Sequence, residues 1–490
     1  MTILEIRKLI GAELVGRSTF SGAIAGLSMH SREIRPGWLF VAVPGTQQDG
    51  ALYAEDAIRR GAVAVLAEKP LSVSSGVAVL VVSNCRLAAA QLAHTFFGAP
   101  SQALRVVGIT GTNGKTTTAT LVKTVFGASG ESAGMVGTIA YEIGNRTIAA
   151  TRTTPDCVTL QHLLQGMVKA GCRAAVLEVS SHALMQQRTA GIDFAAAAFT
   201  NLTHDHLDYH GTMEAYYDAK ATLFRNLPAG RCGVVDVDDA WGAKLAAESL
   251  ACDIIRTGLD IKADVRAVMQ TQTLDGSRFH VFSPWGEQEV ALQLPGMHNV
   301  RNALICFALT CALGISPQTV ASALGGVRSV RGRLQRLHVS APFRIFVDYA
   351  HTEDALRSVL PELRRYTEGQ LRVVFGCGGG RDTQKRALMG RAVYENADVA
   401  YVTSDNPRNE RPEDIIAAVL TGFPEDALVC VEPDRRAAIA LALSEARAGD
   451  TLCIAGKGHE VYQEVEGRML PFDDIQVTTE LLASMGYRAA

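Results

Sequence analysis

The segment at residues 104–118 restricts the fold of this chain more than any other. The run L-R-V-V at 104–107 predicts a strand, G-I-T-G-T-N-G-K-T-T-T at 108–118 supplies closely spaced glycines, and the residues that follow favour a helix. A strand, a glycine-rich turn and a helix N-terminus together form an anion site, because their backbone amides point at the ligand. The common spelling G-x-x-x-x-G-K-[ST] would need a glycine at Ile109. The segment therefore predicts a nucleotide site on an α/β fold, with a motif that departs from the common consensus.

The residues of this loop have separate roles in the predicted site. Gly111 and Gly114 let the backbone approach phosphate oxygens. Lys115 would neutralise phosphate charge, and the Thr116 hydroxyl would coordinate Mg²⁺. The predicted nucleotide-binding residues of the loop are Gly111, Thr112, Asn113, Gly114, Lys115, Thr116 and Thr117. The alternative is an ordinary glycine turn before a helix that contains a lysine, but the preceding strand and the order G-K-T-T-T favour the nucleotide site.

Composition and charge argue against several classes of protein. A length of 490 residues predicts about three domains, and 48% hydrophobic with 20% charged residues is typical of a globular protein. A net charge of −3 without a long basic run argues against nucleic-acid binding. The N-terminus has no signal-peptide core and no stretch approaches about 18 apolar residues, so we expect a cytoplasmic protein without membrane insertion. The ten cysteines include no C-x-x-C pair, which argues against a zinc site or a disulfide framework.

Strand-like and helix-like segments alternate through the chain, and two boundaries separate them into three blocks. The segment G-A-P-S-Q at 98–102 is typical of a linker, and the basic segment 327–337 lacks apolar periodicity. The predicted domains are 1–98, 99–332 and 333–490. In the middle block, the continuous apolar runs at 173–180 and 194–202 are typical of parallel strands buried on both faces. The alternation predicts an open α/β sheet in every block.

The densest group of ionisable side chains follows these two apolar runs. Glu178 lies near the end of the first run, where a carboxylate is costly unless it meets a cation, and His206 follows the second run. The carboxyl ends of parallel strands lie at one edge of a sheet, where ligands collect. We therefore predict a second Mg²⁺ site between the γ-phosphate and the acceptor. Two alternatives are open for the histidines at 204, 206 and 210: simple loop polarity, or zinc, although no cysteine or H-E-x-x-H spacing supports zinc.

The loop G-I-T-G-T-N-G-K-T-T-T resembles the ATP loop of the Mur ligase family, cytoplasmic enzymes that add amino acids to the peptidoglycan precursor. The resemblance covers essentially the whole chain and is closest to the MurE branch, which adds the third residue of the stem peptide. It implies an N-terminal UDP-precursor-binding α/β domain, a central P-loop-type ATP-binding domain with a parallel sheet, and a C-terminal Rossmann-like domain for the amino acid. The implied reaction adds meso-2,6-diaminopimelate to UDP-N-acetylmuramoyl-L-alanyl-D-glutamate through an acyl phosphate, with ATP and Mg²⁺. We expect a monomer.

The resemblance also implies the catalytic set. The implied catalytic residues are Lys115, Glu178, His206 and Lys220, and the implied metal ligands are Thr116, Glu178, His206 and Lys220. In this family the lysine at the place of Lys220 is carbamylated by CO₂ and becomes an anionic ligand. That reaction needs an unprotonated amine, which partial burial and nearby cations supply by lowering the pKa. On composition alone, Lys220 in Y-Y-D-A-K-A-T-L-F would be a solvated helix lysine.

Two groups of binding residues follow from the same resemblance. The UDP-precursor would be held by Met29, Ser31, Thr46, Gln47, Gln48, Thr153, Thr154, Ser180, Gln186 and Arg188, the first five at its uracil end. The adenosine part of ATP would be held by Asn302, Arg333 and Asp348, with Asp348 on the ribose. Asn299 lies three residues before Asn302 on the same helix face, and capping of the helix N-terminus is the alternative role for Asn299.

The amino-acid pocket is the last group that the resemblance implies. Its residues would be Arg381, Asp405, Asn406, Pro407, Arg408, Gly456 and Glu460. In the MurE branch, D-N-P-R at 405–408 is the signature of enzymes that take meso-diaminopimelate, whereas an ordinary loop is the alternative. The guanidinium of Arg408 can bind the far carboxylate of that amino acid through two parallel bonds, and Glu460 would hold the ammonium beside it.

Two kinds of rival function are open. Another family member would add lysine or D-alanyl-D-alanine, or would add glutamate to folate. A protein of a different class would bind nucleotide without ligase turnover. The presence of Glu178, His206 and Lys220 argues against the second rival, and amine-dependent release of ADP distinguishes the two.

Overall fold

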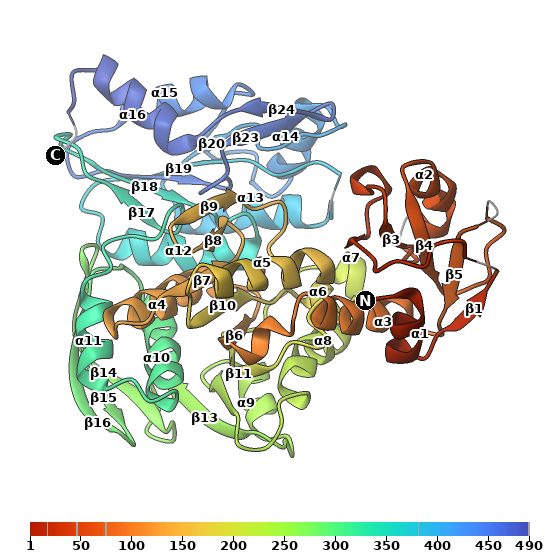
Figure 1. The fold of residues 1–490 in the computed structure, drawn as a ribbon. Coiled ribbons are helices and arrows are strands. Elements are labelled where there is room, and N and C mark those ends of the chain that lie inside the picture. Colours follow the sequence, from red (N-terminus) through yellow and green to blue (C-terminus); the bar gives the residue numbers. More distant parts are fainter. Residues whose placement is uncertain (17, 46–47, 74–75, 381, 489–490) are drawn as a thin grey trace.

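The computed structural model describes residues 1–16, 18–45, 48–73, 76–380 and 382–488, and it contains three separate large sheets. In Figure 1 the central part of the chain lies between the other two: the N-terminal part stands to its right, and the C-terminal part lies above it. Among the described residues, every helix is too short or too polar to cross a membrane.

The N-terminal part is a five-stranded sheet in the order β1-β5-β4-β3-β2, in which β1 is antiparallel to β5 and the other pairs are parallel. Its strands are β1 Glu13–Val15, β2 Gly26–Ser28, β3 Trp38–Val41, β4 Ala62–Ala67 and β5 Ala78–Val81. Its helices are α1 Ile3–Ile10, α2 Ala54–Arg59 and α3 Cys85–Phe96, with short 3₁₀ turns at η1 Ser31–Glu33, η2 Gly50–Tyr53 and η3 Pro100–Gln102.

The central sheet has eleven strands in the order β16-β15-β14-β13-β12-β11-β6-β10-β7-β8-β9. They are β6 Arg105–Thr110, β7 Ala133–Val136, β8 Ala140–Ile143, β9 Arg146–Ala149, β10 Ala174–Glu178, β11 Phe194–Phe199, β12 Cys232–Asp236, β13 Asp253–Gly258, β14 Val265–Thr273, β15 Gly276–Ser283 and β16 Gly286–Leu292. The helices are α4 Lys115–Ala128, α5 Cys157–Lys169, α6 Ser181–Met185, α7 Leu207–His210, α8 Met213–Arg225, α9 Ala240–Ala246, α10 Met297–Ala312 and α11 Pro317–Gly325.

The middle of this sheet follows the predicted pattern. β6 pairs in parallel with β10 on one side and β11 on the other, and β10 is buried along its whole length. The apolar runs at 173–180 and 194–202 form β10 and β11, as predicted for strands covered on both faces. The first turn of α5 adds Cys157 and Val158 to the core of the N-terminal part, so these two parts share packing.

Both ends of the central sheet depart from the expected parallel arrangement. β14, β15 and β16 pair in antiparallel fashion, and so do β7, β8 and β9. β14 is exposed or half-exposed over most of its length, and β9 likewise. Strands with one solvated face lack the continuous apolar run that marks a doubly covered strand, and for this reason the sequence pattern did not reveal them.

The C-terminal part is a six-stranded sheet in the order β17-β18-β22-β19-β20-β21, with β17 antiparallel and the other pairs parallel. Its strands are β17 Gln335–Leu337, β18 Arg344–Asp348, β19 Leu371–Phe375, β20 Val399–Val402, β21 Val429–Val431 and β22 Thr451–Ala455, and a separate hairpin consists of β23 Tyr462–Val465 and β24 Arg468–Pro471. Its helices are α12 Glu353–Arg365, α13 Lys385–Asn396, α14 Pro412–Leu420, α15 Arg435–Glu445 and α16 Asp474–Ser484. The short strands β17 and β21 were not predicted, but the α/β class with parallel-rich sheets is confirmed.

Candidate functional site

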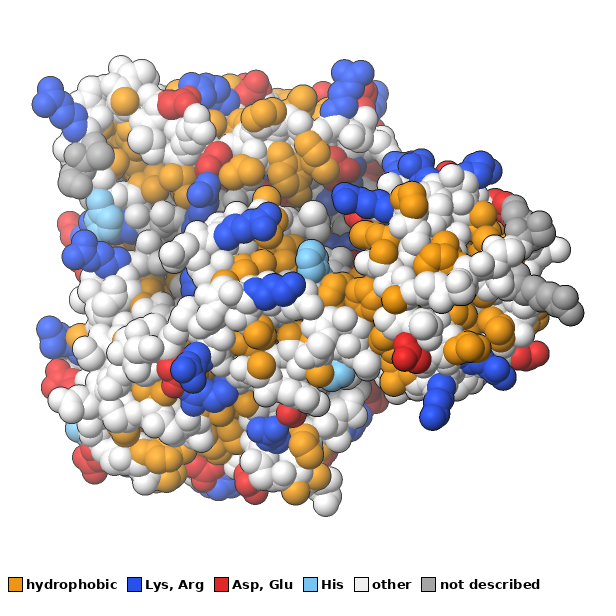
Figure 2. Space-filling model, viewed as in Figure 1, with side chains coloured by type: hydrophobic (Ala, Val, Ile, Leu, Met, Phe, Trp, Pro, Cys, Tyr) orange, Lys and Arg blue, Asp and Glu red, His pale blue; other side chains and the backbone are white. Residues whose placement is uncertain are grey.

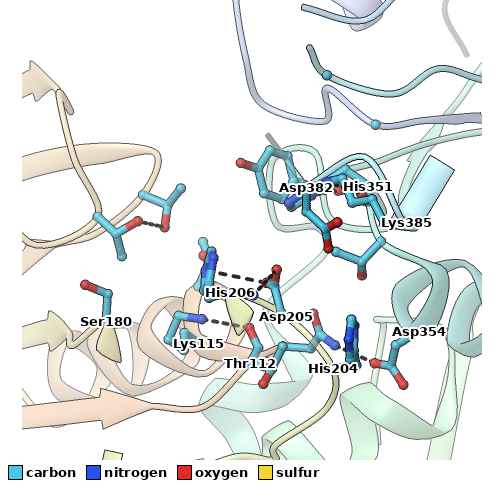
Figure 3. Close-up of a pocket in the computed structure, with 18 of the residues that line it drawn as sticks. Thr112, Lys115, Ser180, His204, Asp205, His206, His351, Asp354, Asp382 and Lys385 are labelled. Carbon is cyan, nitrogen blue, oxygen red and sulfur yellow. Dashed lines mark hydrogen bonds and ion pairs between the residues drawn. The ribbon is translucent and has the colours of Figure 1, made fainter. Parts of the chain in front are cut away.

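A cavity of about 830 Å³ opens where the loops after β6, β10 and β11 meet the C-terminal part. Figure 2 shows basic side chains beside the junction of the three parts on this face. The residues labelled in Figure 3 come from both sides of the cavity: Thr112, Lys115, Ser180, His204, Asp205 and His206 from the central part, and His351, Asp354, Asp382 and Lys385 from the C-terminal part. The predicted site residues that line it are Thr112, Asn113, Gly114, Lys115, Thr116, Thr117, Thr153, Thr154, Glu178, Ser180, Arg188, His206, Arg333, Asp405, Asn406, Arg408, Gly456 and Glu460.

Two glycines of the phosphate loop occupy positions at which a side chain would clash. Gly111 has φ +143° and Gly114 has φ +85°. A Cβ at Gly111 would lie 1.9 Å from Thr200 Oγ1, and a Cβ at Gly114 would lie 2.4 Å from Asn302 Oδ1. The loop is therefore packed directly against the end of β11 and against α10, which fixes its shape.

The two asparagines of α10 support the loop from behind. Asn302 is buried, accepts a hydrogen bond from Thr118 Oγ1 at 3.3 Å and donates one to Asn299 Oδ1 at 3.2 Å. Asn299 in turn donates to the carbonyl of Pro295 at 2.7 Å. The N-cap of α10 is Gly296, so N-capping, the alternative considered for Asn299, is wrong. Asn302 does not line the cavity, and its contact with nucleotide remains a prediction.

Lys115 begins α4 and points into the site (Figure 3). Its ammonium donates to the carbonyls of Gly111 at 2.8 Å and Thr112 at 2.7 Å. Burial lowers the pKa of Lys115, and the nearby Glu178 carboxylate opposes that shift. A half-buried cation held by neutral carbonyls is a good partner for an incoming anion, because its surroundings screen charge less than bulk water does.

Glu178 is fully buried at the end of β10, and hydroxyl and amide donors satisfy its carboxylate. Thr116 Oγ1 donates to it at 2.9 Å, Thr138 Oγ1 at 3.0 Å and the Thr138 amide at 2.9 Å. Thr138 follows β7 and was not singled out in the sequence, because a lone threonine after a strand carries no signal of its own. The carboxylate and the Thr116 hydroxyl thus lie side by side on the cavity wall.

This pair of oxygen ligands fits Mg²⁺. That ion is usually bound by one or two carboxylates together with substrate phosphates rather than by a cage of protein ligands. Among the described residues, no group of three or more histidine, cysteine, aspartate and glutamate side chains could hold a metal ion by itself. Glu178 and Thr116 therefore match a Mg²⁺ that phosphate oxygens would complete, and the arrangement gives no support to zinc.

His206 follows β11 and lies on the cavity wall beside Asp205 (Figure 3). Its backbone has φ +55°, an uncommon conformation for a residue with a side chain, and its Nε2 lies 3.5 Å from Asp205 Oδ2. Burial lowers the pKa of His206 to about 4, although the Asp205 carboxylate acts in the opposite direction. The imidazole is therefore neutral near pH 7, the form that ligates metals.

Lys220 is not a solvated helix lysine, so that alternative is wrong. Its side chain is 1% exposed within α8, and its Nζ donates to the carbonyl of Gly111 at 2.7 Å and lies 4.7 Å from the centre of the Tyr216 ring. Burial lowers the pKa of Lys220 well below its usual value, and the Lys115 cation lowers it further. The amine therefore lies directly beneath the phosphate loop in an environment that favours its neutral form.

Among the described residues, two hydrogen bonds cross between the phosphate loop and the C-terminal part. Asn113 Nδ2 donates to Asp354 Oδ2 at 2.8 Å, and Arg333 Nη2 donates to Thr116 Oγ1 at 3.0 Å. The Arg333 guanidinium also lies 4.4 Å from the centre of the Tyr349 ring. Both contacts join residues more than two hundred positions apart, so the C-terminal part meets the central part at the nucleotide loop itself.

Asp348 lies at the end of β18, but it does not line the cavity. Both of its carboxylate oxygens accept backbone amides, from Ala350 at 2.7 Å and from Leu334 at 2.5 Å. These bonds fix the turn after Arg333 and the turn after β18. The predicted bond to a ribose is not tested by this arrangement.

The hydroxyls and the guanidinium predicted for the precursor lie together. Arg188 donates to the carbonyl of Thr154 at 2.7 Å and to Gln186 Oε1 at 2.7 Å. Thr154 Oγ1 donates to the carbonyl of Glu178 at 2.7 Å, which places it next to the carboxylate site. Gln186 therefore orients Arg188 without lining the cavity itself, and Ser180 is the N-cap of α6 at the cavity edge.

Three of the residues predicted for the uracil end, Met29, Ser31 and Gln48, are described in the N-terminal part and do not line this cavity. Met29 packs against the core of that part, and the buried Ser31 begins η1. Gln48 accepts a hydrogen bond from Tyr53. Thr46, Gln47 and Arg381 lie outside the described residues.

Asp405 and Asn406 follow β20 and form a buried polar corner of the cavity. Asp405 Oδ2 has no hydrogen-bond partner among the described residues, and a Cβ at Gly456 would lie 2.7 Å from it. Asn406 donates to Glu460 Oε2 at 2.8 Å and accepts from Lys457 Nζ at 3.1 Å. Lys457, which was not among the predicted site residues, also forms an ion pair with Glu460.

Arg408 is held in a left-handed conformation with φ +55°. Its Nε donates to Glu464 Oε2 at 3.0 Å and its Nη1 to the carbonyl of Gly379 at 2.5 Å. Pro407 does not line the cavity. Its carbonyl packs so closely against Gly379 that a Cβ at Gly379 would lie 2.1 Å from the carbonyl oxygen. Asp405, Asn406 and Arg408 thus line the cavity with defined partners, and the role of the D-N-P-R segment in amino-acid choice remains a prediction.

Several further ionisable residues line the cavity and were not among the predicted site residues: Arg152, His182, Asp205, His351, Asp354, Asp382 and Lys385. The order of motifs along the chain does not tell which loops from two different parts meet. Lys385 begins α13 shortly after the glycine-rich segment 378–380. A lysine so close to a glycine-rich segment is a pattern from which this site residue could have been predicted.

Family models match the chain in three consecutive segments. "Mur ligase family, catalytic domain" matches residues 23–97, "Mur ligase middle domain" matches 109–310, and "Mur ligase, glutamate ligase domain" matches 332–458.

Curated relatives and solved structures match over nearly the whole length. The chain is 39% identical over 484 residues to a UDP-N-acetylmuramoyl-L-alanyl-D-glutamate–2,6-diaminopimelate ligase of Caldanaerobacter subterraneus subsp. tengcongensis, covering 99% of each chain. It is 44% identical over 465 residues to the protein of the same name from Gloeobacter violaceus, covering 94% of each. A solved structure of a ligase with that name matches with a TM-score of 0.69 and 33% identity over 99% of each chain. The ADP complex of MurF ligase from Thermotoga maritima shares the fold, with a TM-score of 0.64 and 19% identity over 94% of this chain and 97% of that one.

Proposed function

The chain belongs to the Mur ligase family, and we propose that it joins meso-2,6-diaminopimelate to UDP-N-acetylmuramoyl-L-alanyl-D-glutamate with ATP, as the MurE branch does. The observation that carries the proposal is one cavity of about 830 Å³ lined by the phosphate loop, by Thr153, Ser180 and Arg188, and by Asp405, Asn406 and Arg408. Three sets of groups, each suited to one substrate, thus converge on one space. A reaction that consumes ATP also fits the cytoplasmic location expected from the sequence.

The chemistry has two steps. An oxygen of the precursor's terminal carboxylate attacks the γ-phosphorus of ATP, so that a new O–P bond forms and ADP leaves. The amine of the amino acid then attacks the carbonyl carbon of the acyl phosphate, phosphate leaves, and the nitrogen loses a proton to give the amide. Positioning and charge stabilisation supply most of the rate in such phosphoryl transfers, which suits a cavity lined by half-buried cations and by the phosphate loop.

Lys115 and the loop amides would bind the transferring phosphoryl group. The Lys115 ammonium is half-buried and donates to two neutral carbonyls, and among the described residues no carboxylate accepts a hydrogen bond from it. As negative charge develops on the phosphoryl oxygens, this cation stabilises it at short range in a site that screens poorly. Arg333, which reaches Thr116 from the C-terminal part, would add a second positive charge on the same side.

Thr116 and Glu178 would hold Mg²⁺, with His206 as a further ligand. A bound Mg²⁺ supplies charge neutralisation for the phosphate groups and the carboxylate. Thr138 keeps the Glu178 carboxylate oriented through two hydrogen bonds, at 2.9 and 3.0 Å. We propose in addition that Lys220 is a carbamate in the active enzyme: its neutral amine adds to CO₂, an N–C bond forms and a proton leaves. The resulting anion would lie beneath the phosphate loop, where it would complete the ligand set.

The precursor would enter from the N-terminal part. Thr153, Thr154, Ser180 and Arg188 suit its carboxylates and diphosphate, because hydroxyls and a guanidinium are good partners for both. Its uracil end would reach Met29, Ser31 and the segment 46–48. Adenosine would lie on the opposite side, near Asn302, Arg333 and Asp348.

The amino-acid end is the part of the cavity where selectivity would arise. Meso-diaminopimelate differs from lysine by a second carboxylate at its far end, and Arg408 would bind that carboxylate. Lysine would lose those bonds and would leave the guanidinium without its anion. Asp405 and Glu460 would face the ammonium beside the carboxylate, since Asp405 Oδ2 has no hydrogen-bond partner among the described residues.

Arg408→Ala is expected to lower kcat/KM for meso-diaminopimelate by at least about 10- to 100-fold, because charge-assisted hydrogen bonds to the far carboxylate are lost. KM for ATP should stay unchanged, since the hydrogen-bond partners of the Arg408 side chain, Glu464 and Gly379, lie outside the phosphate loop. The measurement is ADP release with each substrate varied in turn. Arg411→Ala is the matched control, because Arg411 lies three residues further along and its side chain is 77% exposed.

The test of the proposed function as a whole is ADP release by the wild type with the UDP-linked precursor and a panel of amino acids. We expect meso-diaminopimelate to be strongly preferred over L-lysine and D-alanyl-D-alanine. A preference for L-lysine would assign the chain to another specificity. ADP release that does not depend on any amine would favour the rival, a nucleotide-binding protein without ligase turnover.

A further inference from the structure

Glu464, in β23, makes three of the hydrogen bonds that attach the hairpin of β23 and β24 to the D-N-P-R segment. The Glu464 amide donates to Asn406 Oδ1 at 3.0 Å, and the Glu464 carbonyl accepts the Arg408 amide at 2.9 Å. The Glu464 carboxylate accepts Arg408 Nε at 3.0 Å. A single residue outside the D-N-P-R segment therefore holds two of its side chains and one of its backbone amides.

The backbone of Arg408 depends on the same hairpin. With φ +55°, Arg408 adopts a conformation that side chains rarely take and that persists only where the surroundings fix it. Its amide donates to Glu464, and its carbonyl accepts the Glu466 amide at 2.7 Å, so that Arg408 and Val465 form a parallel bridge. These two backbone bonds do not depend on the side chain at 464.

The side-chain bond determines which edge of the guanidinium is available. Nε is bound by Glu464, and Nη1 is bound by the carbonyl of Gly379 at 2.5 Å. Nη2 has no acceptor among the described residues, and Gly378 leaves room beside Nη1, where a Cβ would lie at 3.2 Å. A carboxylate can bind end-on across Nη1 and Nη2 while Nε stays with Glu464.

We propose that Glu464 is a positioning residue for amino-acid selection: it holds the Arg408 guanidinium so that its Nη1–Nη2 edge is presented to the far carboxylate of the substrate. The inference rests on the proposed function, because it needs a substrate with that second carboxylate. Glu464 touches no substrate in this scheme and acts through Arg408.

Two effects of the Glu464 carboxylate oppose each other. It fixes a flexible arginine before the substrate arrives, which favours binding, and it repels the substrate carboxylate through the guanidinium, which disfavours binding. The side chains of Glu464 and Arg408 are each 26% exposed, so water weakens the repulsion between the two carboxylates. The orientation of Arg408 does not depend on such screening, and we expect it to be the larger effect.

The test uses Glu464→Gln, which keeps the size of the side chain and both backbone bonds but removes the charge. We expect KM for meso-diaminopimelate to rise about 10-fold, the change expected when a charge-assisted bond becomes a neutral one. The value of kcat at saturating meso-diaminopimelate and KM for ATP should stay within about two-fold, because the phosphate loop is untouched. Glu466→Gln is the matched control: it removes an exposed carboxylate from the same hairpin and should leave all three constants unchanged.

A double-mutant cycle separates positioning from a general loosening of the fold. If Glu464 acts through Arg408, then Glu464→Gln in the Arg408→Ala background should cause no further loss. Additive losses, an unchanged KM in Glu464→Gln alone, or a lower KM would each overturn the inference. A wild type that does not use meso-diaminopimelate would overturn the proposed function and this inference with it. A wild type that uses it, together with an unaffected Glu464→Gln variant, would overturn this inference alone.

Discussion

Lys115→Ala is expected to remove ATP-dependent turnover, with kcat falling by at least about 10²- to 10³-fold. The Lys115 ammonium lies in the phosphate loop, with the carbonyls of Gly111 and Thr112 as its hydrogen-bond acceptors. In the proposed reaction it would stabilise charge on the transferring phosphoryl group. The precursor should still bind, because its predicted partners do not include Lys115. ADP release measures the first expectation, and calorimetric titration of the UDP-linked precursor measures the second.

The same helix supplies a control for this variant. Lys123 lies eight residues further along α4 and pairs with Glu142 away from the loop. Lys123→Ala should keep full turnover, and thermal unfolding of both variants should show that the fold is retained. Undiminished ADP release in Lys115→Ala would remove the assignment of residues 108–118 as the nucleotide site.

The second large effect is expected for Lys220→Ala, which should be inactive at the acyl-phosphate step. The proposed carbamate supplies an anionic ligand, and alanine leaves that ligand out. Short carboxylates such as acetate or formate, added to the Lys220→Ala protein, are expected to restore part of the activity because they can occupy the same space with the same charge. The same carboxylates should not restore Lys115→Ala, whose defect is the loss of a cation.

A direct observation of the carbamate accompanies this rescue test. The wild type incubated with ¹³C-labelled bicarbonate should show a carbamate carbon in its NMR spectrum, and Lys220→Ala should not. A plain amine at Lys220 in fully active enzyme would contradict the proposal, whatever the activity of the alanine variant. Because burial lowers the pKa of Lys220, the carbamate should form near neutral pH, where an exposed lysine would be mostly protonated and unreactive.

The parts of the fold that could be predicted are those whose side-chain pattern depends on burial alone. β6, β10 and β11 are covered on both faces, and a continuous apolar run is the direct result of that environment. The antiparallel ends of the central sheet have one solvated face, and β17 and β21 are only three residues long. Such strands are determined by pairing with neighbours far along the chain, which no local pattern records.

The candidate site shows the same division. A glycine loop before a helix and a carboxylate at the end of a buried strand have local causes, so the sequence could point to Gly111, Lys115 and Glu178. The burial of Lys220 was implied only by family resemblance, because its helix neighbours give no sign of what covers it. Thr138, Lys457 and Glu464 were missed for a related reason: each contacts a partner from a distant segment, which is Glu178, Asn406 and Arg408 respectively.

The two hydrogen bonds that join the phosphate loop to the C-terminal part, Asn113 to Asp354 and Arg333 to Thr116, have a thermodynamic consequence. Ligand binding to the phosphate loop and docking of the C-terminal part both involve the donors and acceptors of these two bonds. The binding equilibrium and the docking equilibrium are therefore linked. Linkage is reciprocal: if nucleotide binding changes the docking constant by some factor, docking changes the nucleotide affinity by that same factor. The residues predicted for the amino acid all belong to the C-terminal part, so amino-acid binding at that place would alter the affinity for ATP through this linkage without contacting the nucleotide.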